Sequence, residues 1–568
     1  MTNEAVKSNG GKDGLRVSYW FCCAAIVVLA VFLRAPAMRS GLPYIDYIDE
    51  GYVLHQAIDL LNHRSLDTRW YGYPSLPAYL TTVTLIAYSP IYHFRHGHGF
   101  RQDLPDDRSI HTSSGDNYDL ISPPELIVAG RFVTVCLSLG TVVLAGAIAT
   151  SLAGQRAGLL AMMITAVCPA LVTRASNVIV DTFATFFALL ALYFCDRLQR
   201  AGQKNHYSSR WSAVFAGLAA GLAFASKYTV AVVFAAVALT IITLPTNRSF
   251  RAWLVVLACG GFLLSSALAA PETLIKPKAV AREVAITAHN YTIITSSPGY
   301  FGQAVARSEL GWPLVIVGCS GLLLMLGSGT TRVSSLSWIL FGGLLLVLFV
   351  GRSFQPFRNL LPLVPEFCIA AAVALVQLLR LPNRDRDHRL GYLGSWLLVL
   401  AIVGGLGYSS WQALRARILH RDTRVLAMDW LRTHTTKNSR ILVLSELGFL
   451  PGEWQRIDAS VRISPWLNAL DLLRREKFDY VVSGNFDFRT GAGTIAASYQ
   501  KIWAPVVSSF IPCASFGHVP TPSVPYFWRT NDERILIYAI QGRPTGLEKM
   551  LQFCACSLAF ESRMLWSR

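Results

Sequence analysis

Long apolar runs, separated by short polar segments, recur along the chain from residue 17 to residue 411. Each run carries few or no charges and is close to twenty residues long, which is enough for an α-helix to cross a hydrocarbon core about 30 Å thick. The length and number of these runs argue against burial in one soluble core. We therefore predict eleven membrane-spanning helices, over residues 17–32, 126–152, 158–172, 178–195, 211–225, 228–244, 253–270, 312–326, 336–350, 360–379 and 393–411.

The basic residues set the orientation of these helices. They cluster in the predicted connections 197–210, 248–251 and 380–389, and Lys and Arg accumulate in the cytoplasmic loops of membrane proteins. The three connections fall on the cytoplasmic side only if segment 74–92 does not cross the membrane. We expect that segment to be a helix on the outer surface, with the N-terminus of the chain inside.

This topology divides the chain into three parts. A cytoplasmic segment, 1–16, precedes a transmembrane domain, 17–411, whose large first external loop is 34–125. From about Arg421 the composition is that of a soluble protein, and helix-like and strand-like segments alternate. The predicted fold class is therefore a polytopic α-helical membrane protein with an extracytoplasmic α/β domain, 412–568.

Composition agrees with this prediction. The chain is 53% hydrophobic and only 15% charged, against roughly 25% charged residues in an average soluble domain. A formal net charge of +17 could indicate nucleic-acid binding, but most basic residues lie between apolar runs. The charge therefore reflects membrane topology, and we expect no nucleic-acid partner.

Acidic residues lie at two places beside the outer membrane surface. The motif YIDYIDEGY, 44–52, follows the first predicted span and contains Asp46, Asp49 and Glu50. Carboxylates held near a membrane acquire shifted pKa values and can act as general bases, although an ordinary solvated loop would also contain them. Asp181 lies at the outer mouth of another span, where an acid is a functional candidate or pairs with nearby Arg174.

Three basic residues break the positive-inside pattern. Lys227 lies between two apolar runs, and Arg352 and Arg358 lie at an outer helix end. Binding a lipid phosphate at the outer leaflet would explain them, because Lys and Arg pair well with phosphate oxygens. The alternative is that they reach toward the lipid headgroups without a specific ligand.

Taken in order along the chain, these segments resemble the GT-C superfamily of membrane glycosyltransferases. The most similar branch is the glycosyltransferase family 39-like group of protein O-mannosyltransferases and aminoarabinose transferases. The resemblance rests on five segments with their order and spacing. They are Asp49-Glu50, YGYPSLPAYL (71–80), NVIVDTFATFF (177–187), GLAFASKYTVA (221–231) and RNLLPLVP (358–365).

The resemblance implies an inverting transfer of a monosaccharide from a polyprenyl- or dolichyl-phosphate carrier to a glycan, lipid or protein acceptor. Asp49 matches the catalytic base, Glu50 would position the acceptor or support Asp49, and Asp181 matches the second acidic position. Lys227, Arg352 and Arg358 would hold the carrier phosphate. Only some relatives need a divalent cation, so the resemblance leaves open whether one lies near Asp49 and Asp181.

The chain also departs from these relatives. Aminoarabinose transferases place a lysine where this chain has Tyr73, and the β-trefoil insert of eukaryotic protein mannosyltransferases is absent. We therefore expect a multi-pass protein of the bacterial cytoplasmic membrane with a different acceptor. Two other functions are compatible with the pattern: a transporter or flippase of lipid-linked sugars, and a non-enzymatic membrane scaffold.

Overall fold

The structure is a computed structural model. It describes residues 4–45, 47–104, 121, 123–202, 206–293, 310–349, 357–380, 389–419, 421–444, 457–464, 466–484, 511–516 and 535–540.

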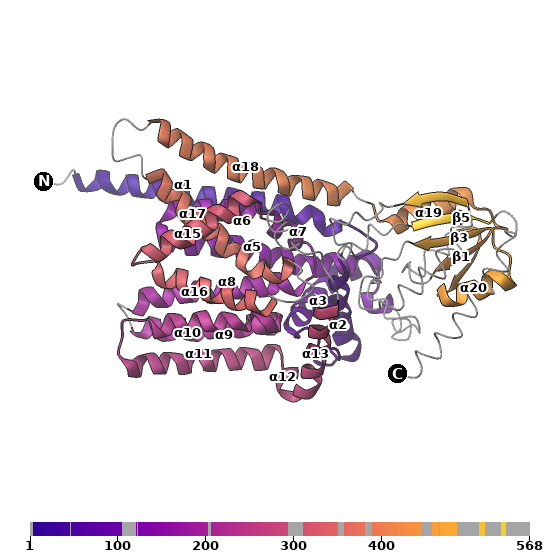
Figure 1. Ribbon diagram of the computed structural model, residues 1–568, viewed down its shortest axis with the longest axis horizontal. Helices are drawn as coiled ribbons and strands as arrows, with labels where there is room; N and C mark the ends of the chain where they lie inside the picture. The colour runs from indigo at the N-terminus through magenta and orange to yellow at the C-terminus, as the bar shows by residue number, and fades with distance from the viewer. Residues whose placement is uncertain are drawn as a thin grey trace.

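A bundle of long helices, lying side by side, forms the larger part of the molecule (Figure 1). Each of the eleven predicted spans overlaps one of its helices. They are α1 (Glu4–Arg34), α5 (Glu125–Ala153), α6 (Gln155–Val167), α8 (Val180–Gly202), α9 (His206–Ser226), α10 (Val233–Ile242), α11 (Arg248–Ala269), α15 (Trp312–Gly327), α16 (Arg332–Phe349), α17 (Val364–Arg380) and α18 (Arg389–Leu419).

The number of helices that could span a membrane is smaller than the number of helices in the bundle. Six helices of the described residues are long and apolar enough to cross a membrane. A bent pair, α6 with α7 (Pro169–Ala175), is turned by 57° at its break and would make a seventh. A polytopic membrane fold is therefore confirmed, whereas the predicted number of eleven is not.

Small residues allow the closest helix contacts in the bundle. A Cβ atom added at Gly217 of α9 would lie 2.0 Å from the Ala258 carbonyl oxygen of α11. At Gly261 of α11 it would lie 2.6 Å from the Val214 carbonyl oxygen of α9. Helices in lipid gain stability from close backbone approach, which only small side chains permit.

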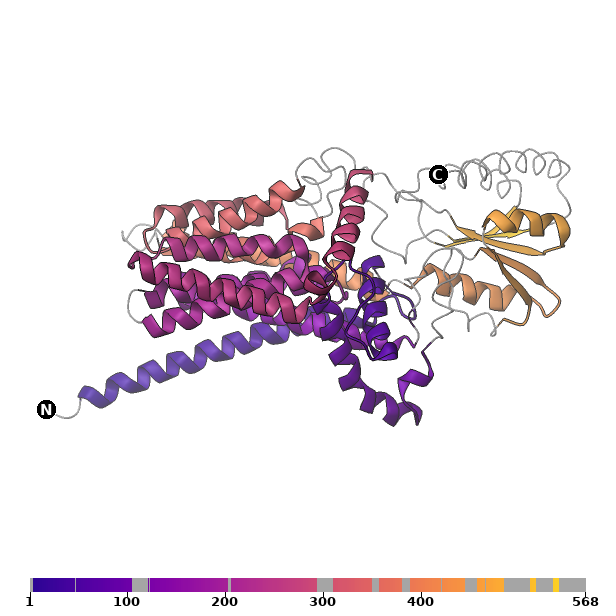
Figure 2. The same cartoon turned by 90° about the horizontal axis from the view of Figure 1, so that it is seen from below.

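A second layer covers the end of the bundle that faces the C-terminal sheet (Figures 1 and 2). It consists of α2 (Ile48–His63), α3 (Leu76–His96), α12 (Glu272–Ile275) and α13 (Pro277–Ile293). The segment 74–92 thus forms a helix outside the bundle, and apolar side chains such as Val83 and Phe94 are exposed on it. Its location on the membrane surface stays a prediction.

The C-terminal part contains a small mixed sheet with the strand order β2-β1-β3-β5-β4. β1 pairs in parallel with β2 and β3, whereas β5 is antiparallel to β3 and β4. Helices α19 (Thr423–His434) and α20 (Trp466–Arg475) accompany it. The strands are β1 (Arg440–Leu444), β2 (Ser460–Ser464), β3 (Tyr480–Gly484), β4 (Ile511–Phe516) and β5 (Ile535–Ala539).

The residue pattern explains this sheet. Buried side chains from α19, β1, β3 and β5 form one apolar core, separate from that of the bundle. The predicted alternation of helix and strand after Arg421 is confirmed, as is the predicted α/β class. The domain boundary at 411/412 stays a prediction. Helix α18 continues past it to Leu419.

Two neighbouring glycines of α11 test the packing of the bundle. A Cβ atom at Gly261 would meet the backbone of α9, whereas one at Gly260 has nothing within 4 Å. We expect Gly261→Ala to cost about 1–3 kcal/mol, as overpacking does, and to lower the thermal midpoint in detergent. Gly260→Ala should leave the midpoint unchanged, and equal midpoints for the two variants would contradict this packing.

Candidate active site

The three predicted acids all lie in the first turn of a helix, at the end of the bundle that faces the C-terminal sheet (Figure 1). Asp49 and Glu50 begin α2, and Asp181 begins α8. The unpaired N–H groups and the dipole of a helix N-terminus favour a carboxylate there. The start of a helix is therefore a suitable place for each of these acidic side chains.

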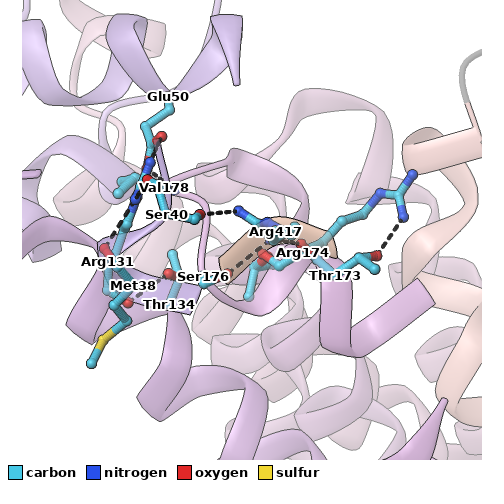
Figure 3. A network of polar contacts seen from close by, with 11 residues as sticks. Met38, Ser40, Glu50, Arg131, Thr134, Thr173, Arg174, Ser176, Val178 and Arg417 are labelled. Atoms are coloured by element: carbon cyan, nitrogen blue, oxygen red, sulfur yellow. Dashed lines mark hydrogen bonds and ion pairs between the residues drawn. The ribbon is translucent and has the colours of Figure 1, made fainter. Parts of the chain in front are cut away.

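Glu50 forms a completely buried ion pair with Arg131 of α5. The Arg131 Nε and Nη2 atoms each donate to a Glu50 carboxylate oxygen at 2.7 Å, and both side chains are 0% exposed. The Glu50 Oε1 atom also accepts from the backbone N–H of Val178 at 3.1 Å (Figure 3). Glu50 therefore joins α5, α2 and the segment that leads into α8.

Asp49 forms an ion pair with Arg358 of the 3₁₀-helix η5 (Phe357–Leu363). The Arg358 side chain is 8% exposed and that of Asp49 is 9% exposed. Arg358 also donates to the Tyr47 hydroxyl at 3.3 Å and lies over the Tyr47 ring. Burial raises the pKa of Tyr47, so this hydroxyl keeps its proton beside two charged groups.

Asp181 pairs with Lys227, which lies at the break between α9 and the 3₁₀-helix η3 (Tyr228–Val232). The Lys227 Nζ atom is 2.5 Å from Asp181 Oδ1 and 2.6 Å from Asn359 Oδ1 of η5. Because Lys227 has an extended backbone conformation there, the helix ends one residue before it. Arg174, the other partner considered for Asp181, lies over the Phe357 ring of η5.

These groups form one cluster with a surplus of positive charge. η5 links the two ion pairs, because its Arg358 belongs to one and its Asn359 accepts a hydrogen bond from Lys227 of the other. Arg174, Arg358 and Asp181 all lie close enough to the Tyr47 hydroxyl to affect its pKa. Among the described residues of the cluster, three cations, Arg174, Lys227 and Arg358, accompany two carboxylates, Asp49 and Asp181, which leaves a formal charge of +1 on that set. Such a site suits an anion with several oxygen acceptors.

The described donor set does not fit a divalent cation. Each carboxylate of the cluster faces a basic side chain, and the described residues contain no group of three or more His, Cys, Asp or Glu residues arranged to hold a metal ion.

The structure brings together four of the six residues predicted for the site, namely Asp49, Asp181, Lys227 and Arg358. Glu50 lies beside them but is occupied by Arg131. Arg352 lies outside the described residues, as does Asp46. The roles predicted for all six stay predictions.

Sequence reasoning missed Tyr47, Arg131 and Asn359. A usable signal existed for Arg131, because it is a lone charge within the apolar run of α5, and charges at such positions are rarely without function. No comparable signal marked Asn359, whose contact with Lys227 joins residues far apart in the chain.

Replacing Glu50 tests the buried pair. Glu50→Ala leaves the Arg131 guanidinium buried without its carboxylate, which typically costs 3–5 kcal/mol. We expect a large drop in the thermal midpoint in detergent, and a smaller drop for the double variant Glu50→Met/Arg131→Met, which buries no charge. A Glu50→Ala protein as stable as the wild type would contradict a structural role for the pair.

Comparisons with known proteins agree with this architecture. Residues 125–271 match the family model described as Dolichyl-phosphate-mannose-protein mannosyltransferase. A search of curated protein sequences gives no match.

Similar solved structures include ArnT from Cupriavidus metallidurans in the apo state, with 12% identity, a TM-score of 0.52 and coverage of 93% of this chain and 98% of that chain. The oligosaccharyltransferase of Archaeoglobus fulgidus, tethered with an acceptor peptide, is 11% identical with a TM-score of 0.51, and 90% of this chain and 75% of that chain are covered. These matches confirm the resemblance predicted from the sequence, and the chain shares the fold of these two solved structures.

Proposed function

We propose that this protein is a glycosyltransferase that moves a monosaccharide from a polyprenyl- or dolichyl-phosphate carrier to an acceptor at the extracytoplasmic face of the membrane. The observation that carries the proposal is the buried cluster in which Asp49 and Asp181 are each paired with a basic residue, with Arg174 as a further cation near Tyr47. A match to a family described by its dolichyl-phosphate-mannose donor supports a lipid-phosphate substrate.

The donor phosphate binds to the basic side of the cluster. Arg358 and Lys227 approach from different elements and are held by Tyr47 and Asn359. The carrier phosphate competes with the carboxylates for these cations, so donor binding loosens the Asp49–Arg358 pair. The sequence places Arg352 close to Arg358, and we keep it as a third phosphate ligand.

Asp49 then acts as the general base. It takes the proton from the acceptor nucleophile while that atom forms a bond with the anomeric carbon of the sugar. The bond between the anomeric carbon and the phosphate oxygen breaks, and its electron pair stays on the carrier phosphate. One displacement of this kind inverts the anomeric configuration.

The remaining residues support this step without taking part in proton transfer. The leaving phosphate gains negative charge, so fixed cations stabilise it more than a proton donor would. Asp181 holds Lys227 in place for this purpose, and Glu50 supports Asp49 through the first turn of α2. The acceptor class stays open between a glycan, a lipid and a protein, and we place the enzyme in the bacterial cytoplasmic membrane.

Asp49→Asn tests the base. Membranes that contain the wild type or the variant at matched levels are incubated with radiolabelled polyprenyl-phosphate sugars. We expect transfer of label to an acceptor to fall by about 10²–10⁴-fold in the variant, as loss of a general base does. Asp429→Asn, at an exposed acid of α19, is the matched control and should keep full activity.

Two results would contradict this assignment. Unchanged transfer by Asp49→Asn would remove Asp49 as the base. Label that crosses the bilayer without reaching any acceptor would indicate a flippase.

Lys227→Gln tests the phosphate site. A contact between a charged donor and phosphate contributes about 1.5–3 kcal/mol, so the inhibition constant of unlabelled polyprenyl phosphate should rise by roughly 10–100-fold. Arg251→Gln, at the start of α11, should leave that constant unchanged. Equal inhibition of Lys227→Gln and the wild type would exclude Lys227 from the phosphate site.

A further inference from the structure

The two acid-bearing parts of the site are each preceded by irregular backbone. Before Asp49 the 3₁₀-helix η1 (Ala35–Arg39) ends at Ser40, and Gly41 turns the chain with a φ of 76°. Before Asp181, α7 ends and Ser176 leads to α8. The backbone hydrogen bonds within these connections are those of single turns, so side chains from other elements contribute to where the acids lie.

Arg131 holds the first connection. Its Nη1 atom donates to the backbone carbonyls of Met38, at 2.9 Å, and Ser40, at 2.6 Å, while its other nitrogens bind Glu50 (Figure 3). Val178, in the second connection, donates its backbone N–H to Glu50, so the Glu50–Arg131 pair contacts the second connection as well.

Arg417 joins the same two connections from the opposite side. It lies in the last turn of α18, the final helix of the bundle. Its Nη1 atom donates to the Thr173 carbonyl and, at 2.9 Å, to the Ser176 hydroxyl. Its Nη2 atom donates to the Ser40 hydroxyl at 3.1 Å. Ser40 is thus held by Arg131 at its carbonyl and by Arg417 at its hydroxyl.

The chain that follows Arg417 makes one more contact with the first connection. Asp422 caps α19 and pairs with Arg424, and both side chains are buried. The Arg424 guanidinium lies 3.7 Å from the centre of the Tyr44 ring, which is itself fully buried. The junction of α18 and α19 therefore contacts the segment before Asp49 at both Ser40 and Tyr44.

We propose that Arg417 is a positioning residue for the transfer reaction, an inference that rests on the proposed function. It sets the distance between the Asp49 and Asp181 segments, and hence between the base and the cations that hold the phosphate. It also makes the start of the sheet-bearing C-terminal part a structural component of the active site. Arg417 acts through its hydrogen bonds to Ser40, Thr173 and Ser176.

A kinetic comparison separates positioning from a general effect on stability. A misplacement of about 1 Å can lower the rate by about 100-fold, so Arg417→Ala should lower kcat by roughly 10–100-fold and leave the donor KM within about threefold. Arg415→Ala is the matched control, because Arg415 is exposed on the same helix and should keep wild-type kcat.

Two milder variants keep the test valid if Arg417→Ala does not fold. A lysine ammonium cannot reproduce the planar fork of arginine. Arg417→Lys can therefore keep the hydrogen bonds to Thr173 and Ser176 but loses the hydrogen bond to the Ser40 hydroxyl. Ser40→Ala removes the same single bond. We expect the two to lower kcat similarly, by about 3–10-fold, and the double variant to be no worse than either alone.

Amide hydrogen exchange tests the inference without any activity. Exchange in residues 35–45 and 173–181 should be faster in Arg417→Ala than in Arg415→Ala, with the rest of the bundle unchanged. If wild-type protein transfers no sugar, the proposed function fails while this measurement still reports on Arg417. Wild-type exchange and wild-type kcat in Arg417→Ala, or faster exchange throughout the bundle, would overturn the positioning role.

Discussion

The buried ion pair between Glu50 and Arg131 is the interaction on which the rest of the site depends. Desolvating two charges costs several kcal/mol per ion, and the attraction between them compensates only when the geometry is good and the remaining donors are used. Here both carboxylate oxygens and all three guanidinium nitrogens have partners. Those partners belong to three segments that are distant in sequence, so the pair determines how the segments meet.

The neighbouring Asp49 follows from this arrangement. It is adjacent to Glu50 in the first turn of α2, so fixing Glu50 also fixes the direction in which Asp49 can point. Its basic partner comes from η5, which also supplies Asn359 to Lys227. One short helix thus connects both ion pairs, and a phosphate that binds there would affect both carboxylates together.

The C-terminal sheet has its own apolar core, yet its connection to the bundle is not a loose linker. Arg417 and Arg424 lie on either side of the junction between α18 and α19, and both contact the segment before Asp49. A shift of that junction would therefore act on the segment that precedes Asp49.

The sequence by itself determined what depends on local pattern. Apolar runs located the helices of the bundle, because span length is a property of consecutive residues. Alternation of helix and strand identified the α/β part after Arg421. Acids and bases beside predicted membrane surfaces identified Asp49, Asp181, Lys227 and Arg358 as candidates, because charges there are costly and are kept for a reason.

Tertiary structure decided which of these groups face one another. The pairing of Asp181 with Lys227, the burial of Glu50 against Arg131, and the contacts of Asn359 and Arg417 join residues far apart in the chain, and no local spacing encodes them. The orientation of α3 outside the bundle likewise depends on packing against α2 and α5. Local pattern specifies elements and candidate charges, whereas partners in three dimensions depend on how the elements pack.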